Sequence, residues 1–192
     1  MPVFICVYLF FLLQHATLTQ WDEFSHWGLS TNEMLRTNRI RPNDTVTMCQ
    51  DYPPGSNLFQ YFFARNSVWT EGTFLFAQNV AMFLPLAFLY EKVKWNEILK
   101  IIGLALSCYF ILDNLGMGLQ TIYVDPMLSS VFAASLAAYY YLKLNRLSIF
   151  WLAPVFFALP LIKQYGAVLG CVLLLLFLVD EWFTQKPSVF KQ

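Results

Sequence analysis

An acidic pair in the first polar stretch of the chain is the first candidate for catalysis. Asp22 and Glu23 follow an apolar run, and His26 stands one helical turn after Asp22. A carboxylate can take a proton from a hydroxyl group, and Asp and His at positions i and i+4 can contribute two ligands to a metal ion. The structural alternatives are that the acidic pair favours the dipole at a helix start and that His26 forms hydrogen bonds at a membrane interface.

Three further polar features lie later in the chain. Tyr52 and Pro53 belong to a rigid Asp-Tyr-Pro-Pro-Gly turn. Asp125 precedes a proline at the start of an apolar run, and Lys163 and Tyr165 interrupt the last apolar stretch. Each feature has a structural alternative. The Asp-Tyr-Pro-Pro-Gly segment would be only a turn, Asp125 would only cap a helix, and the aliphatic part of Lys163 would lie along apolar surface while its ammonium group reaches water. The functional interpretation of Lys163 is an ammonium group that holds a phosphate.

The composition assigns these groups to a membrane protein. Of the 192 residues, 58% are hydrophobic and only 12% are charged, and the formal net charge is zero. Soluble domains carry about 25% charged residues, so about half of the usual polar coat is missing. Membrane lipid is therefore an expected partner. Nucleic acid is not, because its binding requires a basic surface.

Apolar stretches predict an all-α fold, a polytopic integral membrane bundle of helices. The predicted spans cover residues 2–18, 72–90, 98–116, 126–142, 148–162 and 166–179. A secretory signal peptide is the alternative for the first of them. The last two spans are expected to meet at a break around Lys163, because a proline and a glycine flank it.

Residues 19–70 form the predicted outer loop, which begins with an amphipathic interfacial helix. In a helix over residues 21–37, Phe24, Trp27, Thr31 and either Met34 or Leu35 would share one face. The two tryptophans, Trp21 and Trp27, are typical of a helix at headgroup depth.

Basic residues orient the predicted bundle. They flank the second-to-third and fourth-to-fifth connections and follow the last span: Lys92, Lys94, Lys100, Lys143, Arg146, Lys186 and Lys191. Since basic residues favour the cytoplasmic side, the multi-pass chain is expected to place Asp22, Asp125 and Lys163 together on the extracytoplasmic face of the cell membrane.

In this order, the features resemble the amino-terminal part of the GT-C fold membrane glycosyltransferases. This superfamily includes the protein O-mannosyltransferases and the lipid A aminoarabinose transferases, the family 39-like members. The resemblance is carried by the Asp22-Glu23 pair, the Tyr52-Pro53-Pro54-Gly55 turn, Asp125 and Lys163. The two motifs Trp-Asp-Glu-Phe-Ser-His-Trp and Asp-Tyr-Pro-Pro-Gly are similar to those of the bacterial cell-envelope members of this superfamily.

The resemblance implies an inverting sugar transfer from a polyprenyl-phosphate donor to a cell-envelope polymer, lipid or protein. Asp22 would be the catalytic base and Asp125 would support it. Glu23 would position the acceptor or, in place of Asp22, bind the divalent metal ion that some members require. Lys163 would neutralise the leaving phosphate. The other residues predicted to bind substrate are Tyr52, Pro53, His26 and Tyr165, of which the family pattern does not include His26.

Family members are generally longer, so the single module of residues 1–192 is expected to be the amino-terminal part of an enzyme or a shortened member. Two other functions remain open. The first is a transporter or flippase subunit for envelope precursors, which predicts polar groups near the membrane midplane, where the sequence has few. The second is a non-catalytic membrane scaffold.

Overall fold

The chain is all-helical, as the sequence predicts. The computed structural model describes residues 2–40, 45–90, 96–113, 118–145 and 148–185, and these ranges contain no strand. The helices are α1 (Pro2–Leu13), α2 (Gly28–Thr37), α3 (Gly55–Arg65), α4 (Glu71–Tyr90), α5 (Ile98–Asp113), α6 (Asp125–Leu144), α7 (Ala153–Ile162) and α8 (Gly166–Gln185). A π-helical turn, η1 (Glu23–Trp27), precedes α2, and a 3₁₀ turn, η3 (Ile149–Leu152), precedes α7.

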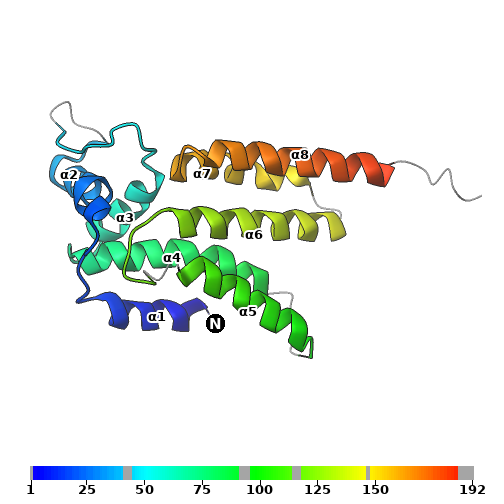
Figure 1. Cartoon of the computed structure of the whole chain (residues 1–192), viewed down its shortest axis with the longest axis horizontal. Helices are drawn as coiled ribbons and strands as arrows, with labels where there is room; N and C mark the ends of the chain where they lie inside the picture. Colours follow the sequence, from blue (N-terminus) through cyan, green and yellow to red (C-terminus); the bar gives the residue numbers. More distant parts are fainter. Residues whose placement is uncertain (1, 41–44, 91–95, 114–117, 146–147, 186–192) are drawn as a thin grey trace, which may run out of the picture.

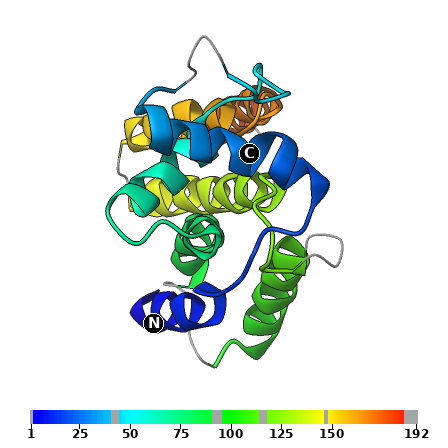
Figure 2. The same cartoon turned by 90° about the vertical axis from the view of Figure 1, so that its left-hand side faces the viewer.

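Helix α4 is the centre of the bundle. It packs against α1, α3 and α6, while α7 packs against α8 (Figure 1). The core joins Phe74 and Leu75 of α4 to Leu128 of α6, Leu159 of α7 and Leu173 of α8, all of them buried. Helices α2 and α3 gather at one end of the long helices, and Figure 2 views the molecule from that end. This end therefore presents the loops that carry the predicted site.

The helix bounds follow the predicted spans closely for α4 and α6, and the break between α7 and α8 falls at Lys163. Helix α1 ends at Leu13, five residues before the predicted end at Leu18. Its 12 residues extend about 18 Å, less than the roughly 30 Å of a hydrocarbon core. Within the described ranges, one segment, Gly166–Thr184, is both long and apolar enough to cross a membrane.

Only two of the seven basic residues that orient the predicted bundle lie within the described ranges. Lys100 lies in α5 and Lys143 in the last turn of α6. Outside the described residues are Lys92, Lys94, Arg146, Lys186 and Lys191.

The predicted interfacial helix begins with a wider turn than expected. The Gly28 N–H donates to the carbonyl of Glu23, a step of five residues that defines a π-helical turn. Trp27 is buried, as are Thr31 and Met34, whereas Phe24 is 54% exposed. The prediction for Phe24 is therefore wrong, because the wider turn rotates its side chain away from the core and brings Glu23 inward.

A glycine permits the tight break between α7 and α8. A Cβ atom on Gly166 would lie 1.9 Å from the carbonyl oxygen of Leu159 and 2.3 Å from its carbonyl carbon. Both are backbone atoms, which cannot move aside as a side chain can. The same test at Gly103 in α5 finds no atom within 4 Å.

We expect Gly166→Ala to destabilise the fold by about 1–3 kcal/mol, because the added methyl group overpacks the α7–α8 turn. Gly103→Ala is the matched control. It should be neutral or stabilise by about 0.5–1 kcal/mol, because alanine favours helix. Thermal unfolding of both variants in detergent measures the difference, and equal unfolding temperatures would contradict the close packing at Gly166.

Candidate functional site

Glu23 connects two loops at the end of the bundle. Its side chain is fully buried, and one carboxylate oxygen accepts the N–H groups of Thr19 and Gln20, each at 2.9 Å. The other oxygen accepts the N–H of Ile122, also at 2.9 Å. Glu23 therefore fixes the segment before η1 to the segment before α6, and it offers no exposed surface to an acceptor.

A chain of buried polar side chains ties the same loops to the helices. Asn57 donates to the carbonyl of Trp27 at 2.7 Å and to the hydroxyl of Thr31 at 2.9 Å. Thr31 donates to Gln60 at 2.8 Å, Gln60 to Gln78 at 3.2 Å, and Gln78 to the carbonyl of Tyr123 at 2.9 Å. We call Asn57, Thr31, Gln60 and Gln78 the buried hydrogen-bond chain, and it holds α2, α3 and α4 in register with the loop before α6.

Asp22 receives a hydrogen bond from a residue that the sequence did not single out as functional. The Tyr123 hydroxyl donates to Oδ2 of Asp22 at 2.9 Å. Burial raises the pKa of Tyr123 to about 12, with help from the hydrogen bond to Asp22 and the charges of Asp22 and Glu23. Tyr123 thus stays protonated at neutral pH and keeps donating to Asp22.

A second pair of contacts joins the start of α6 to the break between α7 and α8. The Lys163 ammonium group donates to Oδ1 of Asp125 at 2.6 Å, and the lysine side chain is 20% exposed. Its neighbour Gln164 donates to the carbonyl and to Oδ2 of Asp51, at 3.1 and 3.0 Å. Lys163 is therefore held beside an acidic group at the surface.

His26 is a member of an aromatic cluster. Its ring stacks on Tyr52, with centroids 5.2 Å apart and planes at 11°, and Trp27 packs on Tyr52 at 4.8 Å. The Ser25 hydroxyl lies 2.8 Å from Nδ1 of His26. Burial lowers the pKa of His26 although the Asp22 charge opposes this, so the imidazole is neutral at pH 7.

These contacts form a closed series around one end of the molecule. We call its members the end cluster: Asp22, His26, Asp51, Tyr52, Tyr123, Asp125, Lys163 and Gln164. Contacts across space alternate with short stretches of chain, since Tyr52 follows Asp51, Gln164 follows Lys163, Asp125 stands two residues after Tyr123, and His26 stands four residues after Asp22. Among the predicted site residues, Pro53 is half-buried beside this series and Tyr165 is 70% exposed.

The predicted metal ion at Asp22 or Glu23 does not fit these contacts. Both oxygens of Glu23 accept backbone N–H groups, and one oxygen of Asp22 accepts the Tyr123 hydroxyl. Within the described ranges, no three His, Cys, Asp or Glu side chains are grouped so that they could hold a metal.

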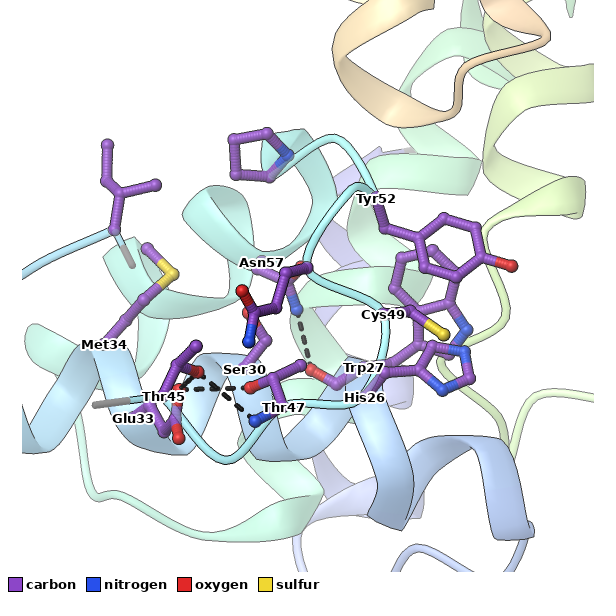
Figure 3. A pocket seen from close by; sticks show the side chains of 13 residues that line it. His26, Trp27, Ser30, Glu33, Met34, Thr45, Thr47, Cys49, Tyr52 and Asn57 are labelled. Carbon is purple, nitrogen blue, oxygen red and sulfur yellow. Dashed lines mark hydrogen bonds between the residues drawn. The ribbon is translucent and has the colours of Figure 1, made fainter. Parts of the chain in front are cut away.

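A pocket opens beside the end cluster, between α2 and the loop that follows it (Figure 3). Its walls include His26, Tyr52, Ser30, Asn57 and Cys49, and its enclosed space measures about 20 Å³, room for about one water molecule.

Glu33 of α2 fixes the loop that lines this pocket. Its carboxylate accepts the Val46 N–H at 2.7 Å and the Thr47 hydroxyl at 3.0 Å, and Thr45 also donates to it. Burial alone would raise the pKa of Glu33, but these hydrogen bonds and the Arg36 charge together lower it from its ordinary value of 4.5. The sequence did not indicate this role of Glu33, because an acidic residue in a polar helix is normally expected to face solvent.

Tyr123 could have been found from its position. In the order Ile122-Tyr123-Val124-Asp125, aliphatic residues alternate with residues that carry a polar group, and an extended segment would send Tyr123 and Asp125 to the same side. The structure buries Ile122 and Val124 but not Tyr123 and Asp125. Gln164 carries no comparable signal, because its contact with Asp51 depends on how the outer loop folds.

The chain matches no protein-family model, no curated protein and no solved structure. Its function is therefore inferred from the geometry and chemistry of its own residues.

We expect acid to loosen the pocket loop through Glu33. Because folding lowers the pKa of Glu33, its stabilising contribution is present above pH 4.5 and is lost as the pH falls through the folded-state pKa. Glu33→Gln should lower the unfolding temperature at pH 7 and flatten the decline between pH 5 and pH 3 relative to the wild type. Glu97→Gln, which alters a half-buried carboxylate paired with the exposed Lys100, away from the pocket loop, should keep the wild-type profile. Parallel profiles for wild type and Glu33→Gln would exclude this role.

Proposed function

We propose that this chain is a polytopic membrane glycosyltransferase module, which moves a sugar from a polyprenyl-phosphate donor to a hydroxyl-bearing cell-envelope acceptor. The observation that carries the proposal is the end cluster. Asp22, Asp125 and Lys163 come from three distant parts of the sequence, and hydrogen bonds join their surroundings at one end of the helix bundle.

Asp22 is the catalytic base of the proposed reaction. The acceptor oxygen forms a bond to the anomeric carbon as the bond between that carbon and the phosphate oxygen breaks. The hydroxyl proton passes to Asp22, and the polyprenyl phosphate leaves with the electron pair. Attack opposite the leaving group inverts the anomeric carbon. The hydrogen bond from Tyr123 to Oδ2 supports this role, because it fixes the carboxylate and leaves Oδ1 for the acceptor.

Lys163 binds the phosphate of the donor. Its ammonium group has three hydrogen-bond donors, and one of them contacts Asp125. The remaining donors serve the phosphate oxygens, where negative charge grows as the leaving group departs. Asp125 therefore positions Lys163 in this proposal. Glu23 positions Asp22, since it holds the two loops that bring Asp22 and Tyr123 together.

Exposed apolar surface supports the polytopic membrane assignment. Large side chains face outward along both α5 and α8: Ile98, Leu99, Ile102, Leu106, Tyr109, Leu174, Leu175, Leu178, Val179 and Trp182. Lipid would cover this surface, and the end cluster would then lie at the extracytoplasmic membrane surface, at the site-bearing end of α4, α6 and α8 (Figure 1).

One observation bears on the transporter alternative. Lys143 of α6 is paired with Asp180 of α8, and Tyr139 donates to the same carboxylate at 2.6 Å. Lys143 and Asp180 each stand one residue past a predicted span, so the pair would lie at the cytoplasmic mouth of an ion or proton path rather than at the membrane midplane. In this alternative the lipid-linked sugar crosses the membrane without being consumed.

Asp22→Asn should reduce sugar transfer by about 10²–10⁴-fold, because the amide cannot take the acceptor proton. Membranes that contain the protein are incubated with a polyprenyl-phosphate donor carrying a radiolabelled sugar, and the label in envelope acceptors is counted. The matched control is Glu97→Gln, a half-buried carboxylate just before α5, which should transfer at the wild-type rate.

Undiminished transfer by Asp22→Asn would remove Asp22 from the chemistry. Movement of intact labelled donor across sealed vesicles, with no labelled acceptor in the wild type, would instead favour the transporter.

A further inference from the structure

Three exposed arginines have no part in the proposed reaction. Arg36 lies in the last turn of α2, Arg39 follows the end of that helix, and Arg65 is the last residue of α3. Among the residues that the structure describes, none of the three forms an ion pair. Basic residues favour the cytoplasmic side of a membrane, so arginines at the proposed extracytoplasmic end need a specific reason.

A hydrogen bond between α2 and α3 brings these arginines to one surface. The Tyr61 hydroxyl of α3 donates at 2.8 Å to Oδ1 of Asn38, the residue that caps α2. Arg39 follows Asn38 directly, and Arg65 stands one turn after Tyr61. The arginines therefore gather where the end of α2 lies against the last turns of α3, at the end of the molecule that Figure 2 views.

Exposed aromatic side chains lie beside the arginines. The indole N–H of Trp69 donates to Oδ1 of Asn32 at 3.1 Å, and Arg36 stands one turn after Asn32 on the same face of α2. Phe62 stands one turn before Arg65 on α3. The side chains of Phe62 and Trp69 are 62% and 57% exposed. We call the following residues the arginine surface: Arg36, Arg39, Arg65, Phe62, Val68 and Trp69.

Positive charge dominates this surface. Within the described residues 28–40 and 55–70, the single carboxylate is that of Glu33. It is 6% exposed and already accepts hydrogen bonds from the loop that follows α2. The charge of Arg36 acts on this carboxylate and helps to lower its pKa, whereas no described carboxylate is paired with Arg39 or Arg65. A negatively charged partner is therefore favoured here.

The start of α4 sets the depth of the arginine surface in a membrane. Helix α4 has 20 residues and extends about 30 Å, the thickness of a hydrocarbon core. In the proposed membrane arrangement, its first residue, Glu71, lies at the edge of the hydrocarbon, and Val68 and Trp69 lie at headgroup depth. The Thr73 hydroxyl donates to the Val68 carbonyl at 2.7 Å, which fixes this link to the first turn of α4. Headgroup depth is where tryptophan is enriched and where lipid phosphates lie.

We propose that the arginine surface binds the phosphate groups of anionic phospholipids in the leaflet on its own side of the membrane. Guanidinium groups donate paired hydrogen bonds to phosphate oxygens, while Phe62 and Trp69 lie against the glycerol and the first acyl-chain carbons. A lipid covers the charged and the apolar side chains together, whereas a soluble acidic polymer covers the charges alone. This binding requires the proposed membrane arrangement of α4, and it does not require sugar transfer.

Native mass spectrometry of the full chain in detergent measures this binding. The protein is titrated with dioleoyl phosphatidylglycerol, which is anionic, and separately with dioleoyl phosphatidylcholine, which has the same acyl chains and no net charge. The Kd of the first bound lipid is compared. Phosphatidylglycerol should bind about 10–100-fold more tightly, because each arginine near an anionic lipid contributes about fivefold.

Arg39→Gln and Arg65→Gln should each weaken phosphatidylglycerol binding about fivefold and leave phosphatidylcholine binding unchanged. The double variant keeps Arg36 near Glu33, so it should unfold at the wild-type temperature. Lysine at both positions keeps the charge and should restore most of the preference. The matched control is Lys100→Gln, which removes an exposed cation of α5 and should leave the preference unchanged.

Lys163→Gln separates the arginine surface from the proposed donor site, since it should also keep the preference for phosphatidylglycerol. Equal binding of the two lipids by the wild type overturns the proposal, as does a preference that survives the double variant. A heptaglutamate peptide that binds more tightly than phosphatidylglycerol overturns it too, and assigns the surface to an acidic polymer.

The membrane arrangement is tested separately, by alkaline extraction of the chain from phosphatidylcholine vesicles. Extraction removes the spanning arrangement and this proposal with it. A chain that resists extraction but binds the two lipids equally loses the lipid site alone, and sugar transfer that depends on Asp22 stands in that case.

Discussion

The buried carboxylate of Glu23 determines how the functional end of this protein is assembled. Three backbone N–H groups from two segments about 100 residues apart in sequence converge on its two oxygens. A buried carboxylate without partners would cost several kcal/mol, so the two segments must stay together for the fold to persist. Their union places Tyr123 against Asp22, and the chain then continues to Asp125 and its contact with Lys163. The buried hydrogen-bond chain reinforces this arrangement from the helix side, through Gln78 and the Tyr123 carbonyl.

Sequence periodicity and helix breakers predict where most of the helices lie. They do not predict the contacts between segments that are distant in the sequence. The bounds of α4 and α6 follow from apolar runs that end at polar residues, and the break at Lys163 follows from the proline and glycine beside it. The helical stripe is right at Trp27 and Thr31 and wrong at Phe24, because nothing local distinguishes a π-helical turn from an α-helical one. For the site, position along the chain indicated Asp22, Asp125 and Lys163. The structural role of Glu23 depends on Ile122, a partner that no local pattern indicates.

The residues around the proposed site are divided by charge. Lys163 supplies positive charge at the break between α7 and α8, while the pocket beyond His26 has neutral polar walls and one carboxylate that is already hydrogen-bonded. In the proposed reaction, the base is Asp22, which accepts a hydrogen bond from Tyr123, and the cation that serves the phosphate is Lys163, which is paired with Asp125. The base is therefore not neutralised by that cation.

The π-helical turn decides which changes of length one short segment tolerates. Gly28 bonds to the Glu23 carbonyl across five residues, and a Cβ atom on Gly28 would lie 2.8 Å from that oxygen. A π-helical turn holds one residue more than an α-helical turn between the two bonded groups, so deleting one residue there would give an α-helical step and leave α2 close to its present orientation. Thr31 and Met34 would then stay in the core. This segment therefore tolerates conservative substitutions at exposed positions such as Phe24, and it tolerates the loss of one residue better than a regular α-helix does.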